Sequence, residues 1–72
     1  MENRYSVPVE KQVEALRASY LGKRIVIHDM AGEPNYSGRS GVVRFVDDVG
    51  QLHGDWGGLA VNPRCDSFSV IA

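Results

Sequence analysis

The sequence predicts a mainly β protein in which five short strands follow one short amphipathic helix. Near the N-terminus, apolar residues recur every three or four positions, which is the period of one helix face. After Gly22 the period becomes two, as in half-buried strands. The later β-branched segments alternate with turns that are rich in Gly, Asn, Asp and Pro.

The length and composition predict a single domain over residues 1–72. A chain of this size buries only about 60% of the surface that its unfolded form exposes, so its stability is marginal. The chain has 43% hydrophobic and 24% charged residues, which is typical of a globular protein. The formal net charge of -1 removes the strong attraction that drives non-specific binding to nucleic acids.

Cysteine usage and the lack of long apolar runs predict a cytoplasmic protein. Cys65 is the only cysteine, so an intramolecular disulfide and a Cys-based zinc site are both excluded. No run approaches the roughly 20 apolar residues of a membrane span, and no signal peptide is recognisable. We expect no membrane association, no cofactor and a buried, structural thiol at Cys65.

The helix is predicted over about residues 7–21. Ser6 suits the N-cap, Pro8 the first turn and Gly22 the C-terminal stop. One stripe of the helix is apolar: Val9, Val13, Leu16 and Tyr20. Such a stripe can pack on the domain's own core or on another molecule, and we favour the first alternative.

The five predicted strands lie at residues 23–28, 41–46, 51–56, 59–61 and 67–71. A long connection follows the first strand, and Gly57-Gly58 predicts a two-residue hairpin because glycine accepts positive φ. Residues 62–66 break the pattern with one short turn before the last strand. This layout predicts a five-stranded SH3-like barrel over about residues 23–72, with an OB-like barrel as the alternative.

Four stretches, at residues 22–30, 38–43, 46–53 and 56–68, resemble the family known as domain of unknown function number four-three-one-four. The most specific part is Val46-Asp47-Asp48-Val49-Gly50-Gln51-Leu52-His53 followed by Trp56. The resemblance covers roughly residues 16–71. It implies a small β-barrel and an origin in bacteriophages or bacterial mobile elements, and it implies no known activity.

Asp47, Asp48 and His53 form the first candidate site. Carboxylates and an imidazole suit a divalent cation or general-base chemistry. An Asp before a Gly is also ordinary turn chemistry, because its side chain accepts hydrogen bonds from backbone N–H groups. We favour the turn interpretation, and we expect neither a catalytic residue nor a metal ligand.

Aromatic residues and arginines give the other candidates. Trp56 and Tyr36 could line a binding groove between the long first loop and the turn after the second strand, although Trp56 could equally fill the core. Arg39 and Arg44 could grip a phosphate or carboxylate if they share one face, whereas scattered surface arginines are the simpler alternative. We expect Phe68 to lie in the core.

These features favour a non-enzymatic module of phage or mobile-element origin that binds a host protein, for example as an inhibitor of bacterial defence. A first alternative is an oligomer that sequesters a small nucleotide signal at its subunit interfaces. A second is a weak nucleic-acid-binding barrel. The helix stripe or an uncovered strand edge would suit a homo-oligomer.

Overall fold

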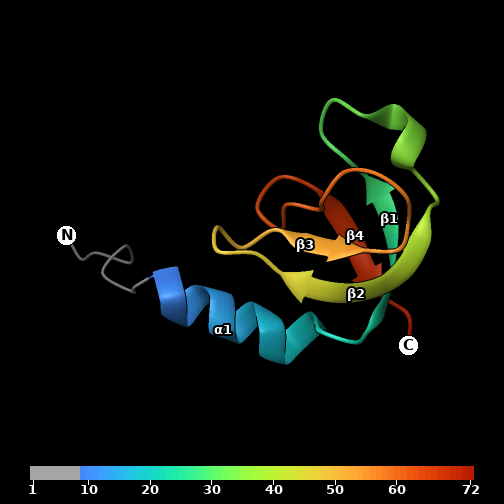
Figure 1. Ribbon diagram of the computed structural model, residues 1–72. Helices are drawn as coiled ribbons and strands as arrows, with labels where there is room; N and C mark the ends of the chain where they lie inside the picture. The colour runs from blue at the N-terminus through green and yellow to red at the C-terminus, as the bar shows by residue number, and fades with distance from the viewer. Residues whose placement is uncertain (1–8) are drawn as a thin grey trace.

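The computed structural model describes residues 9–72 and contains one helix and one antiparallel sheet (Figure 1). The strands follow the order β3-β2-β1-β4 in the sheet. The elements are α1 (Val9–Tyr20), β1 (Arg24–Asp29), the 3₁₀ turn η2 (Pro34–Tyr36), β2 (Ser40–Val46), β3 (Leu52–Gly54) and β4 (Ser67–Val70). The prediction of a mainly β fold preceded by a helix is therefore confirmed.

Helix α1 packs on the sheet through its apolar stripe. Val13 is buried in the core, and Leu16 and Tyr20 pack against it, which confirms the self-packing alternative for these three residues. Gly22 follows the helix with φ of +81°, a conformation that favours glycine, and its N–H donates to the Val43 carbonyl. The expected helix start at Ser6 and Pro8 lies outside the described residues.

Strand β1 lies inside the sheet and pairs with β2 on one side and β4 on the other. Ile25 lies opposite Gly41 of β2, and Ile27 lies opposite Phe68 of β4. Both isoleucines have no exposed surface, so the alternation that the sequence predicted for this strand is correct.

The fifth strand and the closed barrel are not found in the described residues. Residues 59–61 contribute one isolated bridge, between Val61 and Leu52, and the sheet stays open. The reason is that both backbone hydrogen-bonding groups of Leu59 are bonded to side chains. Its carbonyl accepts the Trp56 indole N–H at 2.8 Å, and its N–H donates to the Tyr36 hydroxyl at 2.9 Å, so neither group takes part in a strand ladder.

The third strand ends at Gly54, two residues earlier than predicted, and Gly57-Gly58 forms no two-residue hairpin. At Gly54 the chain lies so close to β2 that a Cβ atom would overlap the Val42 carbonyl and the Trp56 ring. The Trp56 ring packs directly against Gly54 and is buried. Gly57 and Gly58 do adopt the expected positive φ, at +83° and +117°, within a longer loop.

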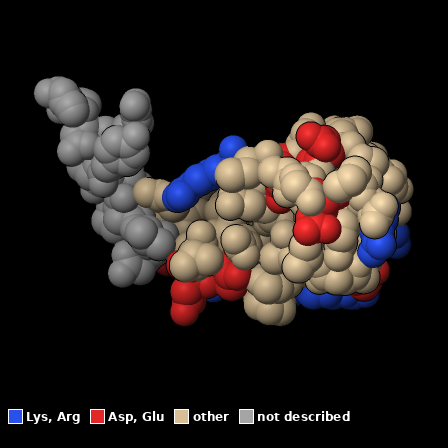
Figure 2. All heavy atoms as spheres, turned by 90° about the horizontal axis from the view of Figure 1, so that it is seen from above, with Lys and Arg blue, Asp and Glu red and all other residues tan. Residues whose placement is uncertain are grey.

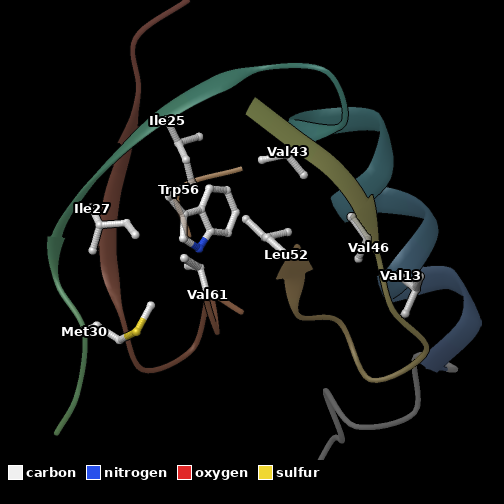
Figure 3. Close-up of a cluster of buried hydrophobic side chains, with 9 residues drawn as sticks. All are labelled: Val13, Ile25, Ile27, Met30, Val43, Val46, Leu52, Trp56 and Val61. Carbon is white, nitrogen blue, oxygen red and sulfur yellow. The ribbon is translucent and has the colours of Figure 1, made fainter. Parts of the chain in front are cut away.

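The core is a single cluster around the Trp56 indole, which is 5% exposed (Figure 3). Ile25, Leu52 and Val61 surround the ring in this view. Phe68 is half-buried, packs against the cluster from its edge and meets Tyr20 edge to face, with ring centroids 5.3 Å apart, so it was expected in the core and lies at its border. The remaining buried members are Val13, Ile27, Met30, Val43 and Val46.

Candidate functional site

The structure divides the predicted site residues into two groups. Tyr36, Arg39 and Trp56 meet around the loop that follows β3. Arg44, Asp47, Asp48 and His53 belong to the β2–β3 hairpin or to the turn that connects its strands. The two groups make different contacts and have different roles.

The first group fixes the loop after β3. The Arg39 guanidinium lies over the Tyr36 ring, 4.2 Å from its centroid, and donates to the carbonyls of Trp56 and Gly57. The Tyr36 hydroxyl accepts the N–H of Leu59. Trp56 takes the core alternative. Each of these three residues makes a hydrogen bond that holds the loop after β3, and we call this group the clasp.

In the second group, Asp47 organises the turn between β2 and β3. One carboxylate oxygen accepts the N–H groups of Val49 at 3.1 Å and Gln51 at 2.9 Å. The other oxygen lies 2.7 Å from Nε2 of His53. The turn interpretation of Asp47 is thus confirmed, and the same carboxylate also holds the His53 ring in place.

The outer face of this hairpin carries an aromatic stack that the sequence prediction missed. Phe45 lies opposite His53 across β2 and β3, with ring centroids 4.3 Å apart and ring planes within 4° of parallel. Phe45 is 53% exposed although it belongs to a strand. The sequence carried no signal for this position, since Phe45 lies two positions after the inward-facing Val43 and would share its face in a regular strand. A register shift between Val43 and Phe45 places Phe45 outside.

Arg44 forms an ion pair with Asp55 at 2.8 Å. The Asp55 carboxylate also accepts the N–H of Val42 at 2.7 Å. This backbone hydrogen bond, followed by the bond from Arg44, lowers the pKa of Asp55 below its ordinary value of 3.8. Arg39 and Arg44 thus each have a partner in the loop after β3, Arg44 the Asp55 side chain and Arg39 the carbonyls of Trp56 and Gly57.

A groove of about 410 Å³ lies beside the stack, between the end of α1 and β2. Its walls include two exposed hydrophobic side chains, Leu21 and Phe45, together with charged groups from β2 and the turn. We call this region the Phe45 surface, and it comprises Leu21, Arg44, Phe45, Asp47, Asp48 and His53.

Within residues 9–72, no group of three or more His, Cys, Asp or Glu side chains is placed to hold a metal ion. Cys65 is exposed, so the expected burial of its thiol is wrong; it lies in the short turn before β4, where its N–H donates to the Asn62 carbonyl. No helix in this part of the chain is long and apolar enough to span a membrane.

The charged residues are dispersed on the face that Figure 2 shows. Lys and Arg side chains of the described residues lie at separate places on this face, with acidic and uncharged surface between them. Such a distribution lacks the basic stripe with which proteins follow a phosphate backbone.

The Asp47 network gives a pH-dependent contribution to stability. The Gln51 N–H, and next the His53 side chain, lower the pKa of Asp47 below its ordinary value of 3.8. A carboxylate with a lowered folded-state pKa stabilises the fold above that ordinary value and loses this effect as the pH falls through the lowered pKa. We expect Asp47→Asn to be less stable than the wild type at neutral pH, with a difference that shrinks below about pH 3.8.

Urea denaturation at a series of pH values measures this difference. Asp48→Asn is the matched control, because the neighbouring Asp48 carboxylate has no hydrogen bond to the described residues. A gap between wild type and Asp47→Asn that stays constant through the acid range would show that the network contributes no pH-dependent stability.

The sequence profile of the family described as domain of unknown function (DUF4314) matches residues 9–71. The chain belongs to this family. The match includes every element from α1 to β4 of this DUF4314 domain, and both groups of candidate residues. No curated protein and no solved structure matches the chain significantly.

Proposed function

We propose that this DUF4314 chain is a non-enzymatic binding module that docks on a bacterial host protein through the Phe45 surface. The observation that carries the proposal is the Phe45–His53 stack, which is exposed and yet held in a fixed geometry. Aromatic side chains are enriched at the centres of protein interfaces, where they supply large apolar contact areas.

The fixed geometry of the stack favours binding. Two backbone N–H groups hold the Asp47 carboxylate, and this carboxylate holds the His53 ring against Phe45. Side chains that are ordered before binding lose little conformational entropy when a partner covers them. The β2–β3 hairpin therefore presents its aromatic face at a low entropic cost.

The charges around the stack favour a protein over a nucleic acid as the partner. Asp47 and Asp48 lie beside Phe45 on the groove wall, and two arginines line the same groove: Arg44, which is paired with Asp55, and Arg17, which donates to the Val46 carbonyl. These opposite charges balance, so the groove has no excess positive charge to attract a phosphate backbone. A rim of both signs around an apolar centre is the usual composition of a protein interface.

A phage or mobile-element inhibitor of bacterial defence would act in this way, by covering a functional surface of its target. The small size of the domain and the family resemblance support this extension of the proposal. The long connection after β1 and the bridge between Leu52 and Val61 also support a relation to the SH3-like barrels, with the bridge in place of a fifth strand.

Affinity capture from a bacterial host lysate tests the proposal with three baits. Wild type and Leu59→Ala should retain the same protein, and Phe45→Ala should lose it, because truncating an interface hot spot costs about 2 kcal/mol or more, roughly 30-fold in affinity. Leu59 is the matched control, since its side chain is 49% exposed and lies outside the Phe45 surface. Equal recovery on all three baits, or no protein above background, would contradict the proposal.

The alternative of nucleotide sequestration predicts a different result. Tyr36 and Arg39 would have to receive the ligand, but both are engaged in the clasp around the β3 loop. We therefore expect no rise in melting temperature across a panel of nucleotides. A rise that depends on ligand concentration would favour the alternative, because a ligand that binds only the folded state stabilises it.

A further inference from the structure

In residues 9–72 no strand pairs with the outer edge of β4, which lies at one end of the sheet. The strand order places β4 at one end and β3 at the other, where the bridge between Leu52 and Val61 partly covers the edge. Among residues 9–72, backbone hydrogen bonds reach β4 only from β1. An open edge of this kind is a template for pairing with another strand.

We propose that two copies of this chain associate through this edge, with the two β4 strands antiparallel about a two-fold axis at Ser69. The two sheets then become one continuous sheet. The partner strand comes from a second copy of the chain. The outward N–H and C=O groups of β4 match those of an antiparallel β4, and so do the charges at its two ends.

The backbone of β4 decides which of its residues can hydrogen-bond to a partner strand. The N–H of Ile71 donates to the Arg24 carbonyl at 2.8 Å, so Ile71 faces β1. Because the direction of the backbone groups alternates along a strand, the N–H and C=O groups of Val70 and Phe68 point away from β1. Antiparallel pairing about Ser69 places Phe68 opposite the partner's Val70, and each pair exchanges two hydrogen bonds.

The side chains along the edge suit the same register. Phe68 and Val70 share the face that Ile25 and Ile27 occupy in β1. Val70 is 44% exposed, and pairing would bring it against the ring of the partner's Phe68. Aromatic residues opposite β-branched residues are among the favourable cross-strand pairs.

Charge complementarity selects the antiparallel orientation. Asp66, whose carboxylate accepts the N–H groups of Ala31 and Asn62, directly precedes β4, and Asp29 of β1 pairs with Ser67. This end of the β1–β4 pair is therefore acidic. At the other end, the backbone of Arg24 exchanges hydrogen bonds with residues 71 and 72. Antiparallel pairing places the acidic end of each copy beside the basic end of the other, whereas parallel pairing would place like charges together.

The dimer leaves the Phe45 surface uncovered, because that surface belongs to β2, β3 and the end of α1. The dimer proposal therefore does not depend on the proposal that the Phe45 surface binds a host protein, and either can fail without the other. If both proposals hold, one dimer presents two Phe45 surfaces, and a target with repeated sites would bind with increased avidity.

Sedimentation equilibrium of the purified chain tests the association. We expect a dimer for the wild type and a monomer for Val70→Pro. Proline removes the Val70 N–H, which is unbonded within the described chain and would donate to the partner strand in the dimer. Val70→Lys places a charge at the same edge and should also give a monomer. Val49→Lys, at an exposed valine in the β2–β3 turn, is the matched control and should stay dimeric.

Disulfide trapping tests the register. In a Cys65→Ser background, Ser69→Cys should form a covalent dimer on mild oxidation, because residues on the axis have Cα atoms about 4.5 Å apart, within the range that a disulfide spans. Val49→Cys in the same background measures random collision. The proposal is overturned by a monomeric wild type, by a dimer that persists in Val70→Lys, or by Ser69→Cys that crosslinks no faster than Val49→Cys.

Discussion

Replacing Trp56 with alanine should remove a large part of the protein's stability. The indole is almost completely buried at the centre of the core, and truncating such a side chain costs about 3–5 kcal/mol. A domain of 72 residues has a total stability of only about 4–11 kcal/mol at typical values per residue. Chemical denaturation followed by far-UV circular dichroism measures the loss.

Trp56→Phe is the informative control for this substitution. It keeps an aromatic ring in the core but removes the N–H that donates to the Leu59 carbonyl. Its loss should be smaller than that of alanine, because most of the apolar contact remains and one hydrogen bond disappears. An alanine variant as stable as the phenylalanine variant would show that the ring does not organise the core.

Gly54→Ala should be the second most damaging substitution. An added Cβ would overlap the Val42 carbonyl of β2 and the Trp56 ring at the same time. A backbone carbonyl cannot move without disturbing the pairing of β2 with β3, so we expect a loss of about 1–3 kcal/mol or more from overpacking. Thermal or urea denaturation measures the loss.

Gly32→Ala is the comparison that separates crowding from backbone conformation. Gly32 has φ of +76°, and no atom lies within 4 Å of the position that its Cβ would take. Its cost should therefore be only that of a positive φ, about 1 kcal/mol. A smaller loss of stability for Gly54→Ala than for Gly32→Ala would contradict the close approach between β2 and β3.

The sequence predicted the elements that depend on local patterns. The spacing of Val13, Leu16 and Tyr20 located the packed face of α1, and the alternation around Ile25 and Ile27 located the inward face of β1. The missing fifth strand could not be predicted in this way. It depends on a bond between the Tyr36 hydroxyl and Leu59, 23 residues apart, and periodicity carries no information about such contacts.

The candidate site shows the same division. The turn role of Asp47 was predictable because its backbone partners lie two and four residues away. The Phe45–His53 stack depends on the register of β2 against β3, which shifts between Val43 and Phe45. A shifted register changes which side chains share a face, so this pair emerges only from the folded arrangement.

Hydroxyl-radical footprinting of the captured host complex tests the central proposal most directly, because it reports the solvent access of individual side chains. We predict that oxidation of Phe45 and His53 falls when the partner is bound, while that of the exposed Leu59 stays unchanged. Unchanged oxidation of Phe45 in a complex that protects other residues would place the interface elsewhere and contradict the role assigned to the Phe45 surface.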